Sequence, residues 1–308
     1  MQGDWSGFTG RLIANGISTD KRGSLLLLDK QPKLNKAVIE LRGNANLCYW
    51  DTNGNQTIGG LSGTTGTYLN GSSKQTNNFT CTWTVGSANT DETFRGVINN
   101  WSCSGSGHTG TVSIVKTGTG LWRLTGNNDY KGTTTVSGGI LIVNGKHTGT
   151  GAVTVKAGAA LGGKGTIAAA VTIQSGGILF VGDTLATDKG LTFSGGLKLN
   201  EGAILQLNDA MIAATYADGD VIHVFANGTV TGAGFSRIEP ERPSDTQEWD
   251  TSELLTKGIL RVRTAGTGLN ILSAPASSTS PCYTLDGRRQ NVSAPGLYIQ
   301  NGKIVVKH

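Results

Sequence analysis

The chain has 308 residues, of which 47 are Gly and 6 are Pro; its charged fraction is 15% and its formal net charge is +5. The regular apolar positions and small net charge exclude a chain that is disordered by composition, and no run of Lys or Arg is dense enough to follow a nucleic acid backbone. Apolar runs such as residues 25–28 are too short to span a bilayer, so we expect neither nucleic acid binding nor membrane insertion.

The first hundred residues combine short strands and tight bends at irregular spacing, as in residues 57–61, TIGGL. Residues 3–10 already have this character, so we expect the chain to be one part of a larger protein that has a catalytic domain upstream. Irregular spacing predicts longer loops, and loops on a rigid scaffold are where binding residues concentrate.

The most regular pattern lies between residues 112 and 230. One short phrase occurs at residues 135–139, 154–158, 172–176 and 192–196, at spacings of 19, 18 and 20 residues, and a related phrase occurs at 229–233. Each phrase reads Thr, an apolar residue, a free position, a small residue and Gly, which is typical of a short strand that enters a tight bend. A period near twenty predicts an all-β solenoid in which each rung covers the next.

The last third of the chain departs from this period. Residues 207–217 are the only stretch with some helical character, and the acidic residues 239–253 are expected to form a loop or cap over the last open edge. Ser, Ala and Pro dominate residues 273–280, as in a linker. We therefore predict a β-helix module at 1–265, a linker at 266–280 and a separate small β unit at 281–308.

Four cysteines occur at positions 48, 81, 103 and 282, none in a CxxC pair, which disfavours a metal site. Cys81 and Cys103 are 22 residues apart, close to one rung. Residues one rung apart lie about 5 Å apart, within reach of a disulfide if both face the same way. A Cys81–Cys103 disulfide and two free thiols are the two alternatives left open.

Residues 116–136, KTGTGLWRLTGNNDYKGTTTV, resemble the autotransporter-associated β-strand repeat, as do residues 89–94 and the Thr-Val-x-x-Gly phrases. This resemblance covers about two thirds of the chain. It implies a right-handed parallel β-helix and no particular activity.

The tail carries a second resemblance. Residues 283–289, 295–299 and 303–307 are similar to type IX secretion sorting domains, which terminate secreted or surface enzymes of bacteria, often glycan-degrading ones. The resemblance implies a secreted or cell-surface protein. The closest functional family is a β-helical carbohydrate-binding module appended to xylanases, on architecture and tail alone, with no ligand motif matched residue by residue.

Pectate lyases and polygalacturonases also use parallel β-helices, and their reactions require clustered carboxylates. The tightest acidic pair, Asp218 and Asp220, lies in a Gly-containing bend that is typical of a solvated turn. Residues 89–91 mimic one polygalacturonase motif, but no Asp-Asp pair follows, and His147 and His223 are isolated. We expect no catalysis, no cofactor and no metal ion on this chain.

Binding a polysaccharide requires exposed aromatic faces with polar side chains beside them. Trp83, Trp101 and Trp122 are 18 and 21 residues apart, so they could form one column along the coil. Trp122 alternates in phase with Leu124 and is predicted to point inward, whereas both orientations stay open for Trp83. Trp101 lies in a polar bend and is predicted to be exposed.

Tyr49 and Trp50 are adjacent, so one of the two should face outward if the segment is a strand. The candidate ligand-binding residues, all in the N-terminal half, are Tyr49, Trp50, Tyr68, Trp83, Arg95, Asn100 and Trp101.

These observations predict a monomeric, noncatalytic module that binds a plant cell-wall polysaccharide, xylan first, as an accessory to an upstream glycoside hydrolase. Two alternatives stay open. A spacer without a ligand would bury its aromatic residues, and a pectinase-like enzyme would carry a carboxylate cluster on a lateral groove.

Overall fold

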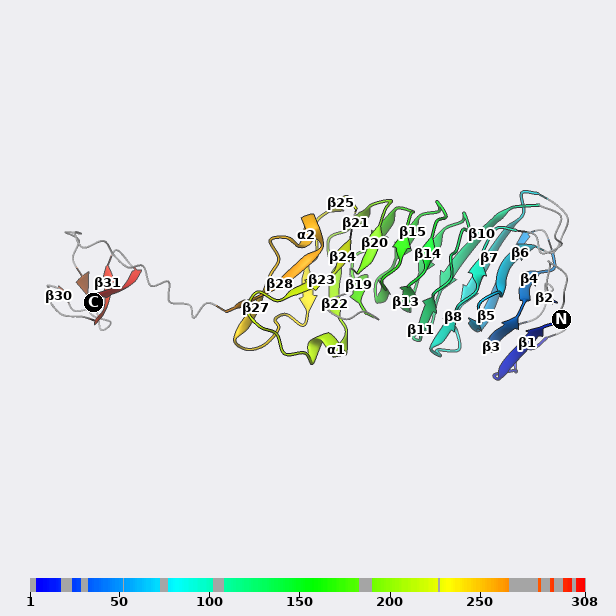
Figure 1. Cartoon of the computed structure of the whole chain (residues 1–308), viewed down its shortest axis with the longest axis horizontal. Coiled ribbons are helices and arrows are strands. Elements are labelled where there is room, and N and C mark those ends of the chain that lie inside the picture. The colour runs from blue at the N-terminus through cyan, green and yellow to red at the C-terminus, as the bar shows by residue number, and fades with distance from the viewer. Residues whose placement is uncertain are drawn as a thin grey trace. The chain divides into compact units, whose positions relative to one another are not determined.

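The computed structural model describes residues 4–17, 24–28, 33–51, 53–72, 77–101, 108–182, 190–226, 228–265, 282–283, 289–290, 296–300 and 303–307. The chain forms two compact units, Met1–Arg263 and Thr264–His308. The larger unit is a parallel β-helix, in which each turn of the coil adds one strand to each of three columns (Figure 1).

The three columns are stacks of parallel strands from successive rungs, and among the described residues the first two columns belong to one 17-stranded sheet. The first contains the beginning of β5 (Asn53–Gly63), then β7 (Thr80–Val85), β10 (Thr111–Lys116), β12 (Thr134–Val136), β15 (Val153–Val155), β18 (Val171–Ile173), β21 (Leu197–Leu199) and β25 (Val230–Gly232). The second contains β1 (Arg11–Gly16), β3 (Leu34–Gly43), the end of β5, β8 (Glu92–Phe94), β11 (Leu121–Leu124), β13 (Gly139–Val143), β16 (Ala159–Gly162), β19 (Ile178–Val181), β22 (Ile204–Leu207) and β26 (Arg237–Glu239).

The third column consists of two sheets. One contains β2 (Ser24–Leu28), β4 (Ala45–Tyr49), β6 (Tyr68–Ser72) and β9 (Val97–Ile98). The other contains β14 (Lys146–His147), β17 (Thr166–Ile167), β20 (Leu191–Phe193) and β24 (Phe225–Ala226). The predicted all-β solenoid is therefore confirmed.

The repeated phrases stack as predicted in three of four cases. Thr135, Thr154 and Thr172 lie directly above one another in the first column. The fourth copy was wrongly assigned: Thr192 lies in β20 of the third column, and Lys198 occupies the next position above Thr172. The turn between these positions is longer than its predecessors, so the same Thr-apolar-x-small-Gly pattern returns on another face.

Apolar side chains fill the interior because alternate strand residues point inward. In β15, Val153 and Val155 are buried while Thr154 is only half-buried. Lys116 is also buried, and its ammonium group donates to the backbone carbonyls of Thr117 (2.7 Å) and Gly138 (3.1 Å). Burial lowers the pKa of Lys116 to about 8.

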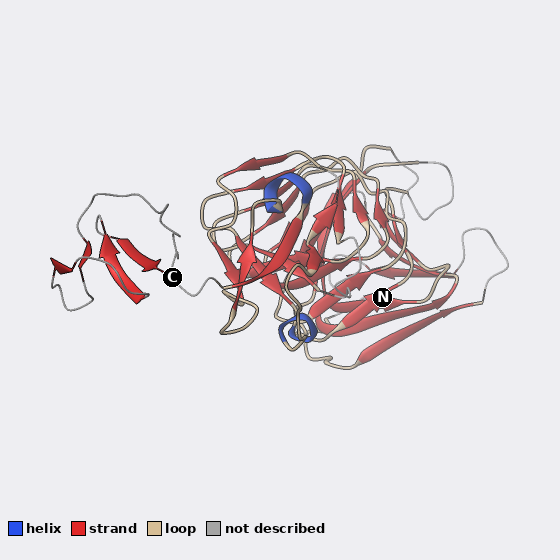
Figure 2. Cartoon of the chain, turned by 60° about the vertical axis from the view of Figure 1, so that its left-hand side comes forward, coloured by secondary structure: helices blue, strands red, loops and turns tan. Residues whose placement is uncertain are grey.

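The C-terminal end of the larger unit has a cap of different construction. It contains α1 (Asp209–Ile212), β23 (Val221–His223), β27 (Gln247–Asp250), α2 (Leu254–Lys257) and β28 (Ile259–Thr264), with β23 and β28 antiparallel. Figure 2 shows the short helices among the strands. No helix in the described residues combines the length and apolarity needed to cross a membrane. α1 lies within the stretch for which helical character was predicted.

The smaller unit is an antiparallel sheet. It contains β29 (Cys282–Tyr283), β30 (Arg289–Gln290), β31 (Gly296–Gln300) and β32 (Lys303–Lys307). The predicted linker at 266–280 lies outside the described residues.

The proposed Cys81–Cys103 disulfide is wrong, because Cys81 is a buried free thiol. In the coil Cys81 stacks on Gly54 and below Val112, so its neighbours in the adjacent rungs are not cysteines. Burial raises the pKa of its thiol to about 12. Cys48 is disulfide-bonded, and Cys103 lies outside the described residues.

Candidate functional site

Two exposed tryptophans lie beside the carboxyl ends of the strands in the third column. Trp50 directly follows β4, and 45% of its surface is exposed. Trp101 is 58% exposed, and its carbonyl accepts a hydrogen bond from Gly71 in β6 (3.3 Å). Since the strands β4, β6 and β9 occupy successive rungs, the backbones of Trp50 and Trp101 are two rungs apart, roughly 10 Å along the coil. We call Trp50 and Trp101 the aromatic edge.

Trp50 lies in the bend that follows β4, and its side chain is exposed whereas that of Tyr49 is buried. Its neighbour Tyr49 is only 3% exposed and packs toward Gly54, where an added Cβ would lie 2.6 Å from the tyrosine oxygen. The prediction that one of these two rings faces outward is confirmed. The same result removes Tyr49 from the candidate ligand contacts.

Trp101 is held by its neighbours in the chain. Its backbone N–H donates to Oδ1 of Asn99 (2.8 Å), and the next residue back, Asn100, is buried. The Asn100 amide accepts from the N–H of Val112 (3.1 Å) and Lys131 (2.9 Å). The Asn100 side chain therefore holds the backbone of neighbouring segments and is not available to a ligand. This corrects its predicted role as a ligand-binding residue.

The three tryptophans expected to form one column lie in three different columns. Trp83 is in β7, Trp122 is in β11, and Trp101 follows β9. The rungs here are longer than twenty residues: Gln56, Trp83 and Ile114 stack directly. The near-periodic spacing of the tryptophans was therefore a coincidence.

Two of these indoles belong to the core. Trp83 is fully buried and donates to the carbonyl of Asn70 (2.9 Å), and Trp122 is buried and donates to the carbonyl of Leu61 (2.9 Å). The inward orientation of Trp122 is confirmed, and Trp83 is removed from the candidate site.

Tyr68 and Arg95 lie beside the amino ends of strands in the third column. Tyr68 begins β6, is half-buried and pairs with Val97, while the exposed Arg95 precedes β9. Tyr68 and Arg95 are therefore separated from Trp50 and Trp101 by the length of a strand. Of the predicted residues, the structure brings together Trp50 and Trp101.

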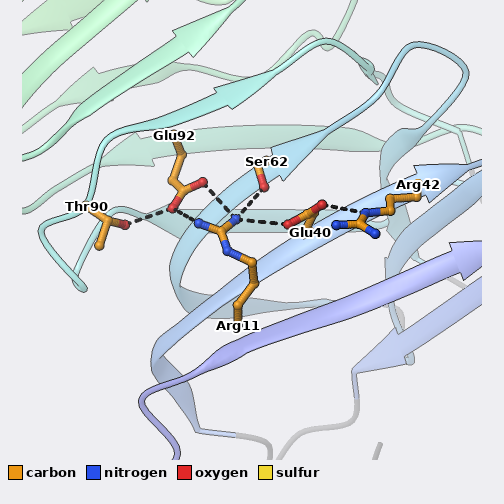
Figure 3. Close-up of polar contacts among 6 residues, drawn as sticks. All are labelled: Arg11, Glu40, Arg42, Ser62, Thr90 and Glu92. Carbon is orange, nitrogen blue, oxygen red and sulfur yellow. Dashed lines mark hydrogen bonds and ion pairs between the residues drawn. The ribbon is translucent and has the colours of Figure 1, made fainter.

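A polar cluster that the sequence analysis missed lies on the second column (Figure 3). Arg11 donates to both carboxylate oxygens of Glu92 (2.8 and 3.1 Å), to Glu40 (3.3 Å) and to Ser62 (2.9 Å). Thr90 also donates to Glu92 (3.1 Å). These residues come from four rungs of unequal length, so no sequence spacing could indicate their proximity.

The polar cluster contains two carboxylates on a lateral face, which is the arrangement expected of a pectinase-like enzyme. Both carboxylates are bound by arginine: Glu92 by Arg11, and Glu40 by Arg11 and Arg42. Oxygens of both carboxylates are thus already occupied by ion pairs within the chain. Within the described part of the chain, no group of three or more His, Cys, Asp or Glu is arranged to hold a metal ion.

Comparison with known proteins identifies the repeat. Residues 114–143 match the Passenger-associated-transport-repeat family, and this segment runs from β10 to β13. The adhesin BmaC autotransporter of Brucella suis biovar 1 (strain 1330) is 48% identical over 59 residues, which are 19% of this chain and 2% of that protein. The chain thus spans a small part of the curated relative it matches.

These matches bear on the class of protein. They support the predicted autotransporter-associated repeat and identify a secreted or cell-surface protein of a bacterium. The similarity of the tail to sorting domains and the relation to carbohydrate-binding modules stay predictions.

Proposed function

We propose that this chain is a noncatalytic adhesive module that binds a polysaccharide through the aromatic edge. The observation that carries the proposal is the position of Trp50 and Trp101, both exposed and two rungs apart at one end of the third column. Indole faces stack on the apolar faces of sugar rings, and a rigid scaffold holds them without loss of conformational entropy on binding.

The exposure of the tryptophans supports a binding role over a spacer. A spacer would bury its aromatic residues, yet Trp5, Trp50 and Trp101 are exposed, while Trp83 and Trp122 fill the core.

The passenger repeat and the adhesin relative support attachment to a surface. The ion pairs that occupy the carboxylates of the polar cluster support a noncatalytic role. We propose a plant cell-wall hemicellulose, with xylan as the first polysaccharide to test, and an upstream glycoside hydrolase in the same protein as the catalytic partner.

Affinity electrophoresis against xylan, mannan, pectin and β-glucan tests this function. We expect retardation on at least one polysaccharide. We expect Trp50→Ala and Trp101→Ala each to weaken binding about fivefold or more, since a stacked aromatic side chain contributes on the order of 1–3 kcal/mol. Circular dichroism checks that both variants keep the β-helix.

Trp5→Ala is the matched control, because Trp5 is exposed but lies before β1 and packs edge-on against Phe8. Its retardation should equal that of the unchanged protein. Absence of retardation on all four polysaccharides would reject the carbohydrate ligand, and equal retardation of all three variants would move the site away from the aromatic edge.

A further inference from the structure

The third column contains a seam at Asn128. The sheet β2-β4-β6-β9 ends below this residue and the sheet β14-β17-β20-β24 begins above it, and Asn128 forms an isolated parallel bridge with His147. The first column continues through the same level from β10 to β12, and the second from β11 to β13. The seam is therefore confined to one of three faces.

The hydrogen bonds across the seam depend on one residue. Below it, Asn128 accepts the N–H of Ile98 at its side chain (2.9 Å), and Asp129 donates to the carbonyl of Ile98 (3.1 Å). Above it, Asn128 donates to the carbonyl of Lys146 (2.7 Å) and accepts from Thr148 (2.8 Å). At this level the Asn128 side chain thus accepts a hydrogen bond that a backbone carbonyl accepts elsewhere in the ladder.

His147 lies behind the seam and is packed as if it were apolar. Its side chain is 4% exposed and stacks on Tyr130 with ring centroids 4.3 Å apart and an interplanar angle of 28°. Neither ring nitrogen has a hydrogen-bond partner among the described residues. Burial lowers the pKa of His147 to about 4. A smaller interaction with the Asn128 backbone, which does not reach regular hydrogen-bond geometry, opposes this shift.

The surrounding groups offer no carboxylate to a protonated ring. Tyr130 contacts the imidazole, but burial raises the pKa of its hydroxyl to about 12, and that hydroxyl is bonded to Thr134 (2.6 Å). Ile167 stacks above His147 in β17. The charged residues of the adjacent segments, Asp129, Lys131 and Lys146, have exposed side chains.

We propose that His147 makes this seam acid-labile, so that protonation of the buried imidazole breaks its stack with Tyr130 and parts the third column between β9 and β14. The opened state lets water solvate the ring and so binds the proton more tightly than the closed state. The turn that carries Trp101 is affected directly, because Asn100 is bonded to Asp129 and Lys131 at the same level.

The direction of the pH dependence follows from the depressed pKa. Between about pH 6.5 and pH 4 the opened state binds more protons than the closed state, so the stability of the seam falls as the pH falls. A difference of this size shifts the opening equilibrium by at most on the order of 10²-fold.

Amide hydrogen exchange read by mass spectrometry, corrected for intrinsic rates, tests the proposal from pH 7 to pH 4. We expect residues 126–149 to lose protection by up to on the order of 10²-fold while residues 153–173 lose little. His147→Phe keeps an aromatic ring against Tyr130 without a titrating group, and it should remove this loss. His223→Gln is the control, since His223 is a half-buried strand histidine elsewhere in the chain, and it should behave like the unchanged protein.

Equal loss of protection in the unchanged protein and in His147→Phe would overturn the proposal. If His147→Phe does not fold, the rate of exchange of the imidazole C2 hydrogen in the unchanged protein, followed against pH, gives the pKa of His147. A His147 pKa near 4 by this measurement supports an imidazole kept neutral by the closed seam, whereas a value near 6.5 overturns it.

Discussion

Arg11 connects four successive rungs of the second column through one guanidinium group. It extends from β1 to Glu40 in β3, Ser62 in β5 and Glu92 in β8. The Glu92 side chain is only 5% exposed, and Arg11 is its ion-pair partner. Through these hydrogen bonds, Arg11 links the first rung to the three rungs that follow.

We expect Arg11→Gln to destabilise the N-terminal rungs by about 1–2 kcal/mol, because it leaves a buried carboxylate without its cation but Arg11 itself is partly solvated. Hydrogen exchange of β1 and β3 should rise, while β15 and β18 stay protected. Arg42→Gln removes a more exposed arginine that contacts Glu40, and it should have little effect. Equal protection of β1 in all three proteins would contradict this role.

At the same scale, alternation along a strand indicated correctly that Trp122 points inward and that Tyr49 and Trp50 face opposite sides. It could not indicate that Asn100 is buried, because that depends on the N–H groups of Val112 and Lys131 that surround it. Polar residues in bends have the same composition whether they hold the chain or contact a ligand.

The rungs are held at close approach by a column of glycines at the corner between the second and third columns. A Cβ added to Gly126, Gly145 or Gly165 would lie 1.8, 2.1 or 2.0 Å from the carbonyl oxygen of the glycine one rung below, with Gly96 at the base. Any side chain here would push the rungs apart. This column explains part of the high glycine content.

We expect Gly145→Ala to lower the free energy of unfolding by about 2–3 kcal/mol, since the neighbouring atom is backbone and cannot move aside. Urea unfolding followed by circular dichroism measures the change. Gly7→Ala is the control, because nothing lies within 4 Å of its added Cβ, and it should be neutral. A neutral Gly145→Ala would mean that the corner relaxes at no cost.

For the molecule as a whole, the β-helix contains its own cap. β23 pairs with β28, and Leu254 and Leu260 are buried at that end. The larger compact unit ends at Arg263, and the antiparallel unit that follows has its own sheet. The β-helix should therefore fold without the C-terminal unit.

A chain of residues 1–265 retains all of β28, and we expect its thermal unfolding midpoint to match that of the β-helix in the full chain. Calorimetry checks this, and affinity electrophoresis of the same shortened chain should give the retardation of the full chain. A clearly lower midpoint would show that the tail stabilises the coil.

The sequence by itself determined the architecture, because a repeated Thr-apolar-x-small-Gly phrase has only one way to bury its apolar side, which is to stack. It also indicated that one of two adjacent aromatic residues, Tyr49 and Trp50, must be exposed, and the structure decided that it is Trp50. Only the tertiary structure decided which residues meet across rungs, since rung length varies along the chain and one long turn moves a phrase to another face. The polar cluster, the glycine column, the seam at Asn128 and the separation of three tryptophans onto three columns all depend on that register, which no local pattern encodes.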